Sequence, residues 1–195
     1  MKALIKMNCK HWQLRDPTIS AKGAKSCSLV TDAQNTKSYL NLGSKENPLR
    51  SPFGATSFND EKATRKTIEF TLDESQAKIF KDFDSWAMNY LASNSERLFK
   101  QTKTLEEIKA IYKSPVSQKS EYRPHLRCKI NTAGAALVRC WDEMGQIREL
   151  PEDLRNCELV PRIHISHLWI MAKDVGWVLK IEDLMVKEAS QECPF

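Results

Sequence analysis

Glycine is scarce in this sequence, with 6 residues in a chain of 195. A phosphate-binding loop needs several closely spaced glycines, because its backbone must approach the phosphates in conformations that other residues disfavour. The sequence has no such loop, and no serine or cysteine stands in a local nucleophile motif. It therefore predicts a protein that is not an enzyme and uses no cofactor, although an active site assembled from distant residues stays an open alternative.

Long hydrophobic runs are also lacking. The longest apolar-leaning stretches, 163–172 and 176–186, are interrupted by histidine or charge. Each is about half the roughly 20 residues that cross a bilayer as a helix. Near the N-terminus, Lys6 breaks the apolar run, so no secretory signal peptide is predicted. We expect an intracellular protein without membrane contact.

The six cysteines include no close pair and stand at Cys9, Cys27, Cys128, Cys140, Cys157 and Cys193. A chain of this size folds without disulfides, so we expect reduced thiols that mostly fill the core. A metal site is not expected either. His164 and His167 are three residues apart in a predicted strand, where they would point to opposite faces and could not share an ion.

The charge that is present is mildly basic and unevenly distributed. The formal net charge is +5 and the sequence pI is about 8.8. Residues 1–50 carry 9 basic and 3 acidic side chains, whereas residues 151–195 carry 5 and 8. This balance permits a polyanionic partner without requiring one.

Hydrophobic periodicity predicts helices between two strand regions. Residues 65–73 alternate as a half-buried strand. Asp73 and Gln76 then form a capping-box pattern before a helix at 74–92, and Thr104 begins a short helix that ends near 113. The expected organisation is one domain with N-terminal strands (1–43), a long loop (44–64), a strand with two helices (65–113), a C-terminal β-meander (117–187) and a tail (188–195).

The C-terminal half is rich in strand patterns. Residues 122–131 alternate, with Leu126, Cys128 and Ile130 on one face and Arg127 and Lys129 on the other. Further strands are expected at 136–141, 146–150, 159–171 and 177–186. The predicted fold class is α+β, a β-rich OB-like barrel or small sandwich with one long and one short inserted helix.

Basic and aromatic residues accompany these strands. Proteins that hold single-stranded nucleic acid combine a cationic groove for phosphates with aromatic side chains on which bases stack. Trp169 and Trp177 stand among apolar residues, which favours the core, and Glu182 and Asp183 are adjacent, so they are expected to diverge into solvent. The candidate nucleic-acid-binding residues are Arg50, Phe53, Arg65, Lys66, Tyr122, Arg123, Arg127, Lys129, Arg139 and Trp141.

The segments 47–54, 65–92, 122–131, 160–171 and 176–186 together resemble single-stranded-DNA-binding proteins of bacteriophages and large algal DNA viruses. The resemblance is one of organisation. It implies an OB-like barrel with inserted helices and no cofactor. It also implies sequence-tolerant binding of exposed nucleic-acid strands during replication or recombination, and it is compatible with a homodimer.

The C-terminus is a weak version of the acidic tail with which phage and bacterial proteins of this kind dock on partners. Here only Glu188 and Glu192 supply side-chain charge, and the chain ends in Phe195. The resemblance gives Phe195 a docking role toward replication proteins.

The leading hypothesis is non-enzymatic binding of single-stranded nucleic acid, DNA or RNA, through a basic and aromatic β-face. The alternative is a structural or scaffolding subunit of a virion or larger assembly. An enzyme is the third reading, with a dispersed site around His125, His164 or His167.

Overall fold

The computed structural model describes residues 12–21, 23–31, 37–57, 60, 62–118 and 121–188. Over these ranges the chain forms three helices, α1 (Glu74–Ser93), α2 (Ser95–Phe99) and α3 (Leu105–Ile111). The strands before the helices are β1 (Trp12–Leu14), β2 (Thr18–Ile19), β3 (Lys25–Thr31), β4 (Tyr39–Asn41), β5 (Ala55–Thr56) and β6 (Arg65–Thr71). Those after them are β7 (Tyr112–Lys113), β8 (Val116–Ser117), β9 (His125–Asn131), β10 (Arg139–Trp141), β11 (Ile147–Arg148), β12 (Cys157–Ile170) and β13 (Val175–Glu188).

Both predicted helices are confirmed, and their first turns show why they start where they do. The Gln76 backbone N–H donates to Asp73 Oδ1 at 2.8 Å, and the Asp73 N–H donates to Gln76 Oε1 at 2.9 Å. Thr104 and Glu107 form the same reciprocal capping box at α3. Such caps typically stabilise a helix by about 1 kcal/mol because they satisfy N–H groups that lack a partner in the helix. The five-residue helix α2 was not predicted.

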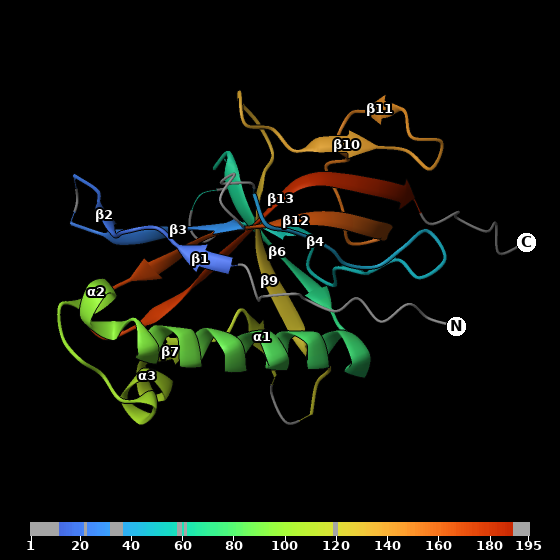
Figure 1. Ribbon diagram of the computed structural model, residues 1–195. Coiled ribbons are helices and arrows are strands. Elements are labelled where there is room, and N and C mark those ends of the chain that lie inside the picture. The colour runs from blue at the N-terminus through green and yellow to red at the C-terminus, as the bar shows by residue number, and fades with distance from the viewer. Residues whose placement is uncertain are drawn as a thin grey trace, which may run out of the picture.

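The strands join one sheet with the order β1-β3-β12-β13-β9-β6-β5. The long antiparallel hairpin of β12 and β13 crosses its centre (Figure 1). The predicted C-terminal meander is wrong, because β9 pairs antiparallel with β6, while β9 and β10 each run parallel to β13. Hydrophobic alternation identifies strands, but it does not identify their partners.

One face of the sheet is buried against the long helix. α1 lies along one side of the strands (Figure 1), and its Phe83 ring lies 5.3 Å from the Trp177 ring of β13 and 6.0 Å from Trp12. Trp177 is only 6% exposed, as expected for a core residue. None of the helices in the described ranges is long and apolar enough to cross a membrane.

Thiols contribute to this core as predicted. The cysteines of the described ranges are all buried, namely Cys27, Cys128, Cys140 and Cys157. Burial raises the pKa of the Cys27 thiol to about 11, so the reactive thiolate is disfavoured there. Cys9 and Cys193 lie outside the described residues.

The opposite face of the sheet, called the outer face below, carries the polar side chains of β6, β9, β12 and β13. In β9 the predicted register is confirmed, because Leu126, Cys128 and Ile130 are buried while Arg127 is exposed and Lys129 is partly exposed. A shift of one residue would have turned both cations toward the core. The outer face is therefore the surface on which Arg127 and Lys129 lie.

Two irregularities in the central hairpin change which residues share this face. The β12–β13 register shifts between Ile165 and His167, so Ser166 is an extra residue in β12. His164 and His167, which pair with positions 180 and 178 of β13, consequently lie on the same face. The prediction that these imidazoles point to opposite faces is wrong because it assumed uninterrupted alternation.

The second irregularity lies a few residues earlier in β12, between Arg162 and Ile163. There Glu182 is the extra residue in β13, and both Glu182 and Asp183 contact outer-face side chains. The prediction that this adjacent pair diverges into solvent is therefore wrong, since a bulge re-aims one of the two side chains.

Candidate nucleic-acid interface

A row of nitrogen-bearing side chains crosses the outer face. Lys129 of β9 is the register partner of Lys180 of β13, which is in turn the partner of His164 of β12. On the other side, the Lys129 Nζ donates to Thr67 Oγ1 of β6 at 2.7 Å. Like charges on neighbouring strand positions destabilise a sheet by up to about 1 kcal/mol, so this row is not explained by stability.

The positive charges of Lys129 and Lys180, and of Arg65 nearby, are not compensated from within the described residues. Burial, followed by the positive charges of Arg65 and Arg127, lowers the pKa of Lys129. Within those residues no carboxylate forms an ion pair with Arg65, Lys129 or Lys180, whereas Arg127 pairs with Glu69 at 2.8 Å. We call Arg65, Lys129 and Lys180 the cationic row. It is a concentration of positive charge for which the described part of the chain supplies no counterion.

The two histidines of the outer face add to this positive charge only when they are protonated. Burial lowers the pKa of His167, and Arg65 and His164 lower it further. The His164 pKa is also lowered, mainly by burial, although Glu182 opposes the change. Both imidazoles are therefore neutral near pH 7 and gain charge only when the pH falls below the ordinary histidine value of about 6.5.

Trp169 lies beside the cationic row and is held by a close backbone contact. Its register partner across the hairpin is Gly176. A Cβ atom at position 176 would approach Trp169 Cζ2 to 2.7 Å and the Lys113 carbonyl oxygen to 3.0 Å. Glycine is thus required for the indole to lie against the strand. Trp169 stays partly exposed, unlike the buried Trp177, so the prediction that favoured the core is wrong for Trp169.

A pocket of about 330 Å³ adjoins this indole. It forms where β9 and β13, which share the single register pair Lys129–Lys180, are bridged by β7 and β8. Its lining includes aromatic, cationic and hydroxyl side chains together with a few apolar ones. The lining residues are Lys113, Ser114, Pro115, Ser117, Arg127, Cys128, Lys129, Trp169, Trp177, Val178 and Leu179. This is the combination that a stacked base next to a phosphate requires.

Asp84 of α1 fixes the segment that closes the pocket. Its carboxylate accepts hydrogen bonds from the Tyr112 hydroxyl at 2.7 Å and from Ser114 Oγ at 2.6 Å. Burial raises the pKa of this carboxyl, while the two hydroxyl donors act in the opposite direction. The helix thereby positions β7 and the start of β8 from the buried side of the sheet.

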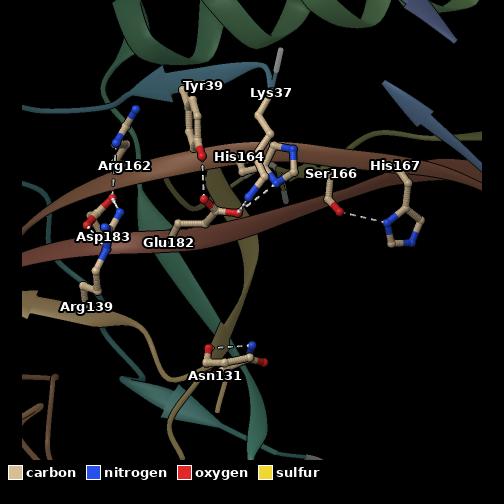
Figure 2. A network of polar contacts seen from close by, with 11 residues as sticks. Lys37, Tyr39, Asn131, Arg139, Arg162, His164, Ser166, His167, Glu182 and Asp183 are labelled. Carbon is tan, nitrogen blue, oxygen red and sulfur yellow. Dashed lines mark hydrogen bonds and ion pairs between the residues drawn. The ribbon is translucent and has the colours of Figure 1, made fainter. Parts of the chain in front are cut away.

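The far end of the outer face differs, because two carboxylates occupy it. Figure 2 shows Asp183 between Arg139 and Arg162, with contacts of 2.8 Å and 3.4 Å. The Trp141 indole N–H also donates to Asp183 Oδ1 at 3.1 Å. The predicted candidates Arg139 and Trp141 are thus both engaged by one carboxylate.

Glu182 organises a second group in the same network (Figure 2). It accepts hydrogen bonds from the Tyr39 hydroxyl at 2.6 Å and the Lys37 ammonium at 2.9 Å, and lies 3.2 Å from His164 Nδ1. Burial raises the pKa of Glu182, but the hydrogen bonds from Tyr39 and Lys37 outweigh it and hold the pKa at about 2. Glu182 is therefore ionised throughout the neutral range.

The other candidates are dispersed. Arg50 pairs with Glu158 at 3.3 Å. The Phe53 ring is 58% exposed and lies 6.4 Å from that of His125. Lys66 is the register partner of buried Ile130, so it belongs to the opposite face from Arg65 and lines a separate pocket near β5.

Tyr122 and Arg123 lie before β9, although they were predicted within its strand. The strand begins only at His125, because Pro124 has no N–H to donate to the ladder. Both side chains are exposed. Phe195, the predicted docking residue, lies outside the described residues.

Sequence reasoning missed Lys180 and Trp169. The signal for Trp169 was available in the tight turn that joins the last two strands, where the Met171 N–H donates to the Asp174 carbonyl at 2.8 Å. Such a turn fixes the hairpin register and places a glycine opposite the tryptophan. Lys180 could not be recognised, because its contact with β9 is parallel and far apart in sequence.

The comparisons with known proteins bear on the fold. No family model and no curated protein sequence matches the chain. Among solved structures, the single-stranded DNA-binding protein gp2.5 of bacteriophage T7 is similar, with a TM-score of 0.52 and 11% identity over 80% of this chain and 88% of that one. The single-stranded DNA-binding protein of bacteriophage Enc34, solved in complex with single-stranded DNA, gives a TM-score of 0.49 and 8% identity over 90% and 96%.

The comparison with gp2.5 establishes a shared architecture. At 11% identity the likeness to gp2.5 is one of fold, and it confirms the resemblance to phage single-stranded DNA-binding proteins at that level. The chain has the strand-rich α+β, OB-like fold of such a protein, with three helices in its described part.

Proposed function

We propose that this protein binds single-stranded DNA without enzymatic activity, on the outer face of its sheet. The observation that carries the proposal is the register pair Lys129–Lys180, which places two lysines at neighbouring strand positions near Arg65, with no ion-pair partner for them in the described residues. Phosphates of a bound strand supply that partner. One base stacks on Trp169, whose position over Gly176 is fixed by the backbone.

The resemblance in fold to gp2.5, a single-stranded DNA-binding protein, supports the same proposal from a separate direction. Stacking on an indole and contact with phosphates are both insensitive to base identity, so binding tolerates many sequences. A protein of this kind covers strands exposed during replication or recombination, which is the cellular role that we propose.

Tryptophan fluorescence provides the test. An oligothymidylate longer than the footprint of one OB fold, which is about 4–16 nucleotides, is titrated into the protein at low salt. Stacking on Trp169 should quench the emission in a saturable manner, and salt should reverse the change. Absence of saturable binding at low salt would rule out the proposed function.

Acidification should tighten binding. His164 and His167 lie on the outer face with lowered pKa values, so both gain a positive charge as the pH falls from about 7.5 toward 5. Oligothymidylate is the suitable ligand because thymine does not titrate in this range. The affinity should rise on acidification in the wild type and stay constant when both histidines are replaced by glutamine.

The same protonation opposes folding in the free protein. A histidine whose pKa is lower in the folded state contributes stability above the ordinary value of about 6.5, and this stability is lost as the pH falls from that value through the folded-state pKa. Thermal unfolding is therefore recorded at each pH, and affinities are compared only where the protein is folded. A pH-independent affinity in the wild type would contradict a DNA path across His164 and His167.

A further inference from the structure

We propose that Asp183 and Glu182 end the DNA track on the outer face, because they hold cations that would otherwise bind further phosphates. The inference rests on the proposed function and concerns how far the strand extends. It divides the outer face into an open half around the cationic row and a closed half around the two carboxylates.

Asp183 neutralises Arg139 in the closed half through a bidentate ion pair. Arg139 Nε lies 2.8 Å from Asp183 Oδ1, and Arg139 Nη2 donates to Oδ2 at 2.8 Å. This fork geometry is the one that an arginine would present to a phosphate. Since Arg139 comes from β10 and Asp183 from its register partner in β13, the pair is built into the sheet.

Arg162 of β12 is held from two sides. Its guanidinium lies 3.9 Å from the centre of the Tyr39 ring, and its Nη1 is 3.4 Å from Asp183 Oδ2. The Asp183 side chain is only 13% exposed, so the ion pairs are less screened than surface pairs. A phosphate that approached Arg162 would meet the negative charges of Asp183 and neighbouring Glu182.

The bulge in β13 is what makes the closed half. Without the extra residue at Glu182, alternation would place only one of the two carboxylates on the outer face. With it, two carboxylates face three cations, Lys37, Arg139 and Arg162. The cationic row has no such carboxylates among the described residues, so phosphates are attracted there first.

The variant Asp183→Asn tests the inference. Asparagine keeps an acceptor for the Trp141 indole but removes the charge that holds Arg139 and Arg162. Each phosphate contacted on a single strand contributes about 0.7 to the slope of log K against log salt. Two released arginines should steepen the slope by about 1.4, tighten binding at every salt concentration and lengthen the DNA segment that each protein molecule occludes.

The matched control is Asp153→Asn. It raises the net charge by the same amount and releases an arginine, Arg155, whose contact with Asp153 is 2.7 Å. Asp153 lies in the exposed turn before β12. The control should leave the slope and the occluded length near those of the wild type.

The outcomes separate the two proposals. If the wild type does not bind single-stranded DNA, the proposed function fails and this inference fails with it. If the wild type binds but Asp183→Asn behaves like Asp153→Asn, only the inference is overturned. Should Asp183→Asn not fold, Glu182→Gln takes its place: it frees Lys37 and should steepen the slope by about 0.7, and an unchanged slope would overturn the inference.

Discussion

Replacing Trp169 with alanine should weaken binding of oligothymidylate by about 1–3 kcal/mol, or roughly 5- to 150-fold, because a base stacked on an aromatic side chain contributes that much. The indole lies over Gly176 and lines the pocket beside Lys129, so its loss removes the stacking surface nearest the phosphates. Most of the fluorescence quenching should disappear with it. Fluorescence anisotropy of a labelled oligonucleotide measures the affinity independently of the protein's own emission.

Trp141 offers a matched comparison on the same face. It is also partly exposed, but its N–H is bonded to Asp183 in the closed half. Trp141→Ala should therefore weaken binding less than Trp169→Ala does. An equal or larger loss for Trp141→Ala would place the bases at the wrong end of the outer face and contradict the account.

Removing both lysines of the cationic row should have the second large effect, with opposite signs in two measurements. In Lys129→Met/Lys180→Met the slope of log K against log salt should become shallower by about 1.4, since two phosphate contacts are lost. The free protein should become more stable by up to about 1 kcal/mol, because burial and the neighbouring charges of Arg65 and Arg127 disfavour the charged Lys129 in the folded state. Salt-dependent titration and denaturant unfolding measure these two changes.

The control for this pair is Lys78→Met/Lys81→Met. Both lysines are exposed on α1, on the side of the sheet away from the outer face, and the loss of charge is the same. The slope should change much less than in the outer-face variant. Equal changes in the two double variants would mean that net charge alone governs binding and that the cationic row has no special role.

The opposite signs matter because they distinguish a binding surface from a structural one. Removing a lysine that is kept for stability destabilises the protein, whereas the charge of Lys129 is disfavoured in the free protein by burial and by Arg65 and Arg127. The fold retains this unfavourable charge on the same face as Trp169, His164 and His167. Sites that act on a partner commonly retain such locally unfavourable arrangements.

Helices and strand faces that depend on residues close together in the sequence were predicted correctly. The helix at 74–92 was predicted from its apolar spacing and from Asp73 with Gln76, and both sides of that capping box are formed. The register of β9 was likewise predicted from strict alternation, so Arg127 and Lys129 were correctly placed on one face. These features depend on residues a few positions apart.

The rest of the outer face depends on contacts that local patterns do not contain. The bulges at Ser166 and Glu182 reverse the alternation within β12 and β13, so His167 and one of the two carboxylates were assigned to the wrong surface. Trp169 has apolar neighbours in sequence, but its exposure is decided across the hairpin by Gly176. Lys180 joins the site only through the parallel contact with Lys129.

Photocrosslinking tests the central claim, that a single strand lies on the outer face at Trp169 and the cationic row, most directly. An iodouracil-containing oligonucleotide is irradiated with the wild-type protein, and the crosslinked peptide is identified by mass spectrometry. We expect the adduct on Trp169 in β12. An adduct confined to Trp12 or to Trp86 of α1, whose rings lie 5.4 Å apart on the helix-covered side of the sheet, would contradict the account.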